Sequence, residues 1–248
     1  MTSLYPPLSP EEIAQRLETI AQEDWVKPLL NTKPNFWRII EYGKNSYEIR
    51  QSRMIGWLLD THQNHGIGDI FVKELIKIYA EDTAQLSNAQ EFLFEKNFST
   101  EVEFEVAITN SRDEKGRLDI QVVDSHNKLL IAIENKMYSS EHNAGKSDAS
   151  QLQVYKEFFD KKIKNPESGY EGYTPLYIYL APAGSETKTE GWVNISHEQL
   201  SEVYESILNL PDISPETHKI LSDFQVDLTR QLNPDLQKRV GELIFENY

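Results

Sequence analysis

Residues 117–136 read RLDIQVVDSHNKLLIAIENK, and this stretch decides the fold. Two apolar runs, Arg117–Val123 and Lys128–Lys136, lie on either side of the polar segment Asp124–Asn127. Runs of this length that are rich in Val, Ile and Leu and separated by a short polar segment are typical of two strands joined by a hairpin. We therefore expect an antiparallel pair whose second strand stays apolar until it ends in charged residues.

The charged end of the second strand places Glu134 and Lys136 on one face, because side chains two residues apart in a strand point the same way. If the polar segment is a four-residue loop, Asp119 faces Ala132, which puts Asp119 diagonally beside Glu134 on that face. A loop of three or five residues would reverse the parity and move Asp119 to the other face. The sequence thus predicts that two carboxylates and one ammonium group converge.

Such a cluster has the groups that phosphodiester hydrolysis requires. Carboxylate oxygens are hard ligands that suit Mg²⁺ or Mn²⁺. A bound metal polarises the phosphoryl oxygen and activates water, while a lysine stabilises the developing negative charge. The alternative interpretation is a surface salt bridge at a strand end. The position at the end of an apolar strand in a hairpin favours the catalytic interpretation.

Helical and strand-like patterns continue on both sides of the hairpin. Ser9 followed by Pro10 is typical of a helix start, and this helix is predicted to reach about Leu30. Thr100–Thr109 alternates apolar and acidic residues, which predicts a strand with Val102, Phe104, Val106 and Ile108 on one side and three glutamates on the other. The other expected elements are helices over 46–60, 67–79 and 148–163, strands over 175–180 and 192–195, and three helices from residue 197 onward. This order predicts a mixed α/β domain.

The motif resembles that of the PD-(D/E)XK nuclease superfamily, whose core is a helix, three strands, a helix and a further strand. It is present here as Arg117–Asp119 followed by Glu134–Lys136, although no proline precedes the aspartate. On the following helix, Gln151 and Tyr155 look like the QxxxY element of RecB-like and Cas4-like members. The stretch 48–68 is similar to the first helices of an uncharacterised bacterial branch of the superfamily.

The resemblance covers about residues 45–200 and implies a restriction-endonuclease-like α/β core. We expect an N-terminal helical extension over 1–44 and C-terminal helices over 201–248 that pack on this core.

The resemblance also implies roles for individual residues. Asp119 and Glu134 would be metal ligands, the backbone carbonyl of Asn135 would be another, and Lys136 would be the catalytic lysine. Glu48 would be the acid on a helix that completes the metal environment. A glutamate in a first helical turn has a simpler explanation too, because it complements the helix dipole.

Gln151 and Tyr155 are four residues apart on the predicted helix, so both are expected to face the site. Tyr155 also forms an apolar stripe with Leu152 and Phe159, which is the pattern of a core position. Four tyrosines further along the chain could stack on nucleic-acid bases, although the last two lie in a predicted buried strand. They are Tyr170, Tyr173, Tyr177 and Tyr179.

The net charge of −15 argues against a nucleic-acid substrate, because phosphate binding depends on Lys and Arg. The deficit is uneven, since residues 165–248 carry 5 basic and 14 acidic side chains. Residues 128–164 contain seven lysines and five acids. We expect binding to be weak, salt-sensitive and carried by five lysines near the site. These are Lys146, Lys156, Lys161, Lys162 and Lys164.

The leading hypothesis is a Mg²⁺- or Mn²⁺-dependent nuclease that acts on DNA in defence or repair. The alternatives are a catalytically silent nucleic-acid-binding or regulatory module on the same fold, and a hydrolase of a smaller phosphate ester. The chain has no cysteine, no apolar run of about 18 residues and no basic-then-apolar start, so we expect a cytoplasmic protein without a membrane partner. A homo-oligomer or a protein partner bound through the acidic C-terminal helices is a further expectation.

Overall fold

The structure is a computed structural model that describes residues 44–82, 96–110, 115–137 and 148–233, together with positions 9, 12, 15, 19 and 113. The chain divides into two compact units. One unit is Tyr42–His218, which contains the sheet, and the other combines Met1–Glu41 with Lys219–Tyr248. Among the described residues, none of the helices has the length and apolarity needed to cross a membrane.

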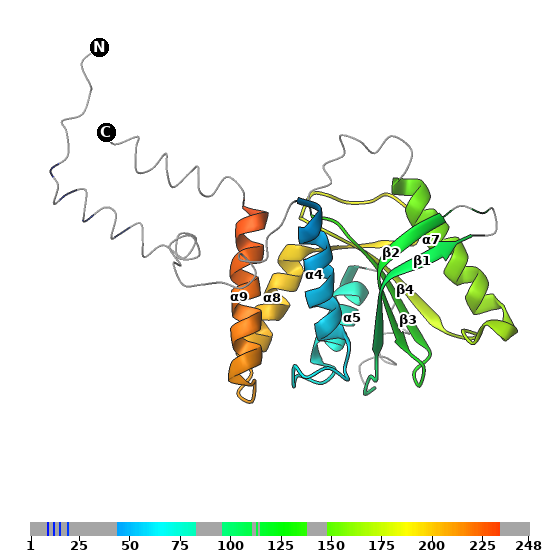
Figure 1. The fold of residues 1–248 in the computed structure, drawn as a ribbon, viewed down its shortest axis with the longest axis horizontal. Coiled ribbons are helices and arrows are strands. Elements are labelled where there is room, and N and C mark those ends of the chain that lie inside the picture. The colour runs from blue at the N-terminus through cyan, green and yellow to red at the C-terminus, as the bar shows by residue number, and fades with distance from the viewer. Residues whose placement is uncertain are drawn as a thin grey trace, which may run out of the picture. The chain divides into compact units, whose positions relative to one another are not determined.

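Within the described residues the sheet has five strands in the order β1-β2-β3-β4-β5 (Figure 1). The strands are β1 (Glu101–Thr109), β2 (Lys115–Asp124), β3 (Leu129–Asn135), β4 (Thr174–Ala181) and β5 (Val193–Ser196). The first three form an antiparallel meander, and β4 and β5 then continue parallel to β3. The predicted mixed α/β fold is confirmed, and it is the arrangement of a restriction-endonuclease-like core.

Helices cover both faces of this sheet (Figure 1). They are α4 (Lys44–Leu59), α5 (Ile70–Asp82), α7 (Asp148–Lys164) and α8 (His197–Leu208), with the short 3₁₀-helix η2 (Pro166–Ser168). A further helix, α9 (Pro215–Leu232), belongs mostly to the other unit. On one face, α4 contacts β1 and β2 while α5 and α8 contact β5; on the other, α7 contacts β1, β2 and β4. β3 is buried on both faces along its whole length, as its nearly continuous apolar sequence predicts.

Capping side chains fix where several helices begin. Ser9 and Glu12 exchange hydrogen bonds with each other's backbone N–H, as the predicted helix start requires. Ser196 and Gln199 form the same reciprocal cap at the start of α8. Positions 12, 15 and 19 are helical, whereas the other residues of the predicted N-terminal helix, up to residue 30, and the third C-terminal helix lie outside the described residues.

The hairpin loop differs from the predicted one by a single position. Asp124 pairs with Leu129, so the four-residue loop is 125–128 rather than 124–127. The reason is that Asp124 is fully buried, and its carboxylate accepts hydrogen bonds from the backbone N–H groups of Ser99 and Asn127. Because the buried Asp124 side chain holds the loop from within the sheet, Asp124 is the last residue of β2 and not the first residue of the loop.

The predicted alternation of β1 is broken at Glu105, which has a backbone φ of +54°. Before this residue, Phe104 packs against Gly56 of α4. After it, Val106 and Ile108 belong to the apolar cluster beneath α7 on the opposite face. The prediction that the apolar residues of β1 all share one side is therefore wrong, because the left-handed conformation of Glu105 turns the strand over.

Candidate active site

The end of β3 brings a buried acid and a lysine together. Only 2% of Glu134 is exposed, and its Oε1 lies 2.7 Å from Nζ of Lys136. The two side chains point to the same face, as the spacing of two predicts. Asn135 between them points to the other face, where its side chain bonds to α4.

Asp119 lies directly across from Glu134 rather than diagonally. β2 and β3 pair Ile120 with Ile133, and continuing this register by one residue places Asp119 opposite Glu134. The pairing differs from the predicted one by two residues, so the parity and the shared face are preserved. Oδ2 of Asp119 accepts a hydrogen bond of 2.7 Å from the backbone N–H of Asn135, which holds the carboxylate against the end of β3.

Glu48 reaches the same place from α4. Its Oε1 accepts a 2.8 Å hydrogen bond from the backbone N–H of Met137, just beyond β3. α4 begins at Lys44 and has no acidic residue in its first turn, so the helix-dipole explanation for Glu48 is wrong. The negative charge of Glu48 also acts on Asp119 and Glu134.

Burial and crowding of negative charge raise the pKa of both sheet carboxyl groups. For Glu134, burial and then the charge of Asp119 raise the pKa to about 8, although Lys136 opposes this. For Asp119, burial raises the pKa to about 6 while the N–H of Asn135 opposes the shift. Burial alone would lower the pKa of Lys136, but the adjacent Glu134 raises it above its ordinary value, so the lysine stays charged.

The oxygen atoms of this cluster fit a hard divalent cation. Oε2 of Glu134 is buried and has no hydrogen-bond partner among the described residues, which leaves a ligand atom available. Within the same part of the chain, no three acidic or histidine side chains form a ready metal-binding group. A cation here would therefore draw on the facing carboxylates of Asp119 and Glu134, with the Asn135 carbonyl and Glu48 as further oxygen donors.

Tyr155, supported by Gln151, contacts β2 just before Asp119. The Tyr155 hydroxyl donates to the carbonyl of Arg117 at 2.6 Å and accepts from the Arg117 N–H at 2.9 Å. Gln151 in turn donates its side-chain N–H to the Tyr155 oxygen. Tyr155 is fully buried in the cluster that includes Leu152, as the apolar stripe predicts. The pair thus fixes the backbone of β2 two residues before Asp119.

A second buried network behind the site was missed by the sequence reasoning. His197 Nε2 lies 2.9 Å from the carbonyl oxygen of Lys136, which can only accept, so this nitrogen carries the hydrogen. Nδ1 of His197 then accepts from the side-chain N–H of Gln51 at 3.1 Å. The Asn135 side-chain amide donates to Ser52 Oγ at 2.9 Å and to the side-chain oxygen Oε1 of Gln51 at 3.3 Å.

This network has a weak signal in the sequence. Gln51 and Ser52 are polar residues that α4 buries, and polar residues in a predicted helix are usually assigned to its exposed face. Burial lowers the pKa of His197 to about 4, which keeps its ring neutral. The side chains join α4, the end of β3 and the start of α8, three segments that are distant in sequence.

Comparison with known proteins agrees with this architecture. Residues 34–226 match the family model described as the PD-(D/E)XK nuclease superfamily. The match spans most of the chain, and the chain belongs to this superfamily, whose members are nucleases that generally use divalent metals. No curated protein and no solved structure gives a significant match.

Proposed function

We propose that this protein is a divalent-metal-dependent nuclease that hydrolyses phosphodiester bonds of DNA, in a defence or repair role. The observation that carries the proposal is the convergence of Asp119, Glu134 and Lys136 at the buried end of β3, where one Glu134 oxygen has no hydrogen-bond partner among the described residues. A salt bridge between Glu134 and Lys136 does not require the second carboxyl group of Asp119, whose charge contributes to the raised pKa of Glu134.

In the proposed mechanism, the carboxylates and Lys136 have different roles. Asp119 and Glu134 would hold Mg²⁺ or Mn²⁺ with the Asn135 carbonyl, and Glu48 would add negative charge beside them. When bound, such a cation supplies Lewis-acid polarisation of the phosphate and lowers the pKa of water. Lys136 presents a permanent positive charge to the phosphate oxygen on which negative charge accumulates.

Positive charge that supports nucleic-acid binding is concentrated at one end of α7. In contrast to the acidic chain as a whole, α7 carries three lysines in its last turn, Lys161, Lys162 and Lys164. Lys162 lies over the rings of Phe158 and Tyr170 at 4.8 and 4.7 Å from their centroids, and Lys156 pairs with Asp160 at 2.7 Å. Lys146 lies outside the described residues. The end of α7 therefore offers a basic surface to a nucleic-acid backbone.

The direct test is cleavage by purified protein. Single-stranded DNA, double-stranded DNA, RNA and p-nitrophenyl phosphate esters are incubated with Mg²⁺, Mn²⁺, Ca²⁺ or EDTA. We expect cleavage of DNA with Mg²⁺ or Mn²⁺ and none with EDTA. Hydrolysis of the small esters alone would contradict the nuclease assignment, and DNA binding without cleavage under every metal condition would contradict catalysis.

A further inference from the structure

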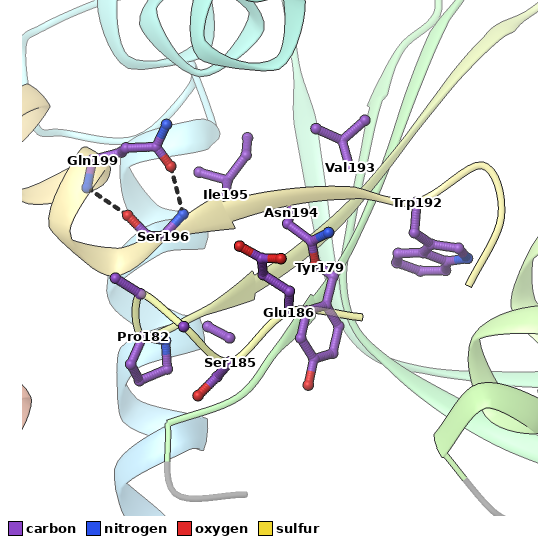
Figure 2. A pocket seen from close by; sticks show the side chains of 13 residues that line it. Tyr179, Pro182, Ser185, Glu186, Trp192, Val193, Asn194, Ile195, Ser196 and Gln199 are labelled. Carbon is purple, nitrogen blue, oxygen red and sulfur yellow. Dashed lines mark hydrogen bonds between the residues drawn. The ribbon is translucent and has the colours of Figure 1, made fainter. Parts of the chain in front are cut away.

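A pocket of about 530 Å³ opens beside the candidate active site (Figure 2). It is formed by the ends of β4 and β5, by the loop of residues 182–192 that joins them, and by the start of α8. Its volume falls in the range of about 300–1,000 Å³ that is typical of sites for small organic groups. Nothing in the proposed catalytic chemistry uses this space.

The sheet register connects this pocket to the catalytic residues. Glu134 pairs with Tyr179, and Tyr179 pairs with Asn194, so the three side chains form a row on the same face of β3, β4 and β5. Neighbouring strands are about 4.8 Å apart, so the pocket wall begins one strand from Glu134. A substrate whose phosphate lies at Glu134 therefore has its adjacent nucleotide within reach of the pocket.

The pocket is shaped before any ligand binds. The Asn194 side chain accepts from the backbone N–H of Thr187 at 2.8 Å and donates to its carbonyl at 3.0 Å, which fastens the loop to β5. Glu198 of α8 accepts from the N–H of Ala183 at 2.9 Å. Trp192 is 6% exposed, and its indole N–H donates to the Leu152 carbonyl, so this ring is a fixed part of the wall.

The chemistry of the lining suits a nucleobase and not a phosphate. Among the described residues that line the pocket, none is basic, and Glu186 is the charged one. The Glu186 side chain extends from the loop toward β5 (Figure 2). Tyr179, which is half-buried, adds aromatic surface, whereas Trp192 and the neighbouring Tyr177 both belong to the core cluster, so Trp192 closes one side of the pocket. A carboxylate accepts hydrogen bonds from the exocyclic amino group of a base, and aromatic rings stack on its face.

We propose that this pocket, the base pocket, receives one unstacked nucleobase that carries an exocyclic amino group, next to the phosphodiester bond that is cut. This inference rests on the proposed nuclease function. Tyr179 provides the aromatic surface for the ring, and Glu186 accepts from the amino group. A base inside a paired stack cannot enter the pocket without being extracted, which costs a few kcal/mol, so the enzyme prefers single-stranded or unpaired DNA.

The experiment measures binding separately from cleavage. Lys136→Ala protein in Ca²⁺ is titrated with fluorescein-labelled 12-nucleotide single-stranded DNA in which one abasic site is moved along the strand. We expect one position, next to the bond that wild-type protein cuts, to weaken binding at least tenfold when its base is removed. At that position, cytosine binds at least tenfold more tightly than thymine, which lacks an exocyclic amino group.

Two variants in the same background assign these effects to the pocket. Ser185→Phe fills the pocket and removes the effect of the abasic site. Glu186→Gln removes the preference for cytosine over thymine, because an amide accepts from the cytosine amino group and equally donates to the thymine O4 that the carboxylate repels. Glu190→Gln makes the same change of charge on the same loop outside the lining and leaves both effects intact. If Ser185→Phe does not fold, Glu186→Gln alone decides.

The outcomes separate this inference from the proposed function. If the affinity for DNA does not depend on the position of the abasic site, or if Ser185→Phe and Glu186→Gln both leave this dependence unchanged, the base pocket is overturned even if the protein cuts DNA. A pocket-dependent profile in a protein that cuts no nucleic acid supports the base pocket and overturns the nuclease proposal.

Discussion

At the scale of single residues, the negative charge of each carboxylate at the end of β3 can be removed by substitution without removing its hydrogen bond to the backbone. Asp119 accepts from the Asn135 N–H, and Glu48 accepts from the Met137 N–H. An amide oxygen can accept each of these bonds, so Asp→Asn and Glu→Gln substitutions remove the negative charge while leaving the backbone contact in place. This makes the carboxylates testable without disturbing the fold.

The first prediction concerns Asp119 and Lys136. Asp119→Asn and Lys136→Ala are each expected to reduce metal-dependent cleavage at least about 10²-fold, because each removes a charge that acts on the transition state. Turnover is measured beside circular dichroism spectra. Asp212→Asn in an exposed turn and Lys128→Ala at the opposite end of β3 serve as matched controls. Wild-type turnover in both site variants would refute the assignment.

The second prediction concerns Glu48. Glu48→Gln is expected to raise the Mg²⁺ concentration for half-maximal cleavage at least tenfold, because a carboxylate near a divalent ion contributes charge that an amide lacks. The measurement is a Mg²⁺ titration of turnover, with Glu74→Gln on α5 as the control. An unshifted titration curve would leave Glu48 as a hydrogen-bond acceptor for Met137 and nothing more.

At the scale of elements, α7 has different tasks at its two ends. Near its start, Gln151 and Tyr155 fix the backbone of β2 before Asp119. Lys162 lies eleven residues after Gln151, which corresponds to about 16 Å along a helix. Under the proposed function, the lysines at the end of α7 would contact phosphates that flank the cleaved bond, whereas Lys136 is the cation beside the carboxylates of the candidate site.

The third prediction follows from this separation. Reversal of charge in the double variant Lys161→Glu, Lys164→Glu is expected to weaken DNA binding and to reduce the slope of log K against log salt by about 2, because each lost phosphate contact changes the slope by roughly one. Binding is measured in Ca²⁺ over a range of salt concentrations. Lys77→Glu on α5, across the sheet, is the control. A slope equal to that of the wild type would place the nucleic acid elsewhere.

At the scale of the whole molecule, buried His197 joins α4, β3 and α8 only while its ring is neutral. Its folded-state pKa of about 4 lies below the ordinary value of 6.5, so the folded protein binds fewer protons than the unfolded chain between these pH values. The stability that depends on the neutral ring is thus complete above about pH 6.5 and is lost as the pH falls toward 4.

The fourth prediction is the size of this loss. His197→Gln keeps a donor for the Lys136 carbonyl but cannot titrate. Between pH 7 and pH 4, we expect the wild type to lose about 3 kcal/mol more unfolding free energy than the variant. Urea denaturation in EDTA at several pH values measures it. Parallel pH profiles for the two proteins would show that His197 does not limit acid stability.

The sequence by itself determined the main helices and strands and the convergence of the three charged residues at the candidate site. Periodicity and capping are local properties of the backbone, so α4, the β2–β3 hairpin and the Ser9 cap follow from neighbouring residues. Even a loop placed one residue off kept Asp119 on the side of Glu134, because a register shift of two preserves parity.

Only the tertiary structure decided which distant residues meet. At Glu105 the apolar side chains of β1 change from one face of the sheet to the other, and this change depends on packing from both faces. The alternating sequence alone predicts an uninterrupted strand. Gln51, Asn135 and His197 come together because three elements converge on the end of β3. The base pocket likewise exists because the loop after β4 is fastened across β5 by Asn194. Such contacts join residues that are far apart along the chain, so sequence patterns among neighbouring residues do not predict them.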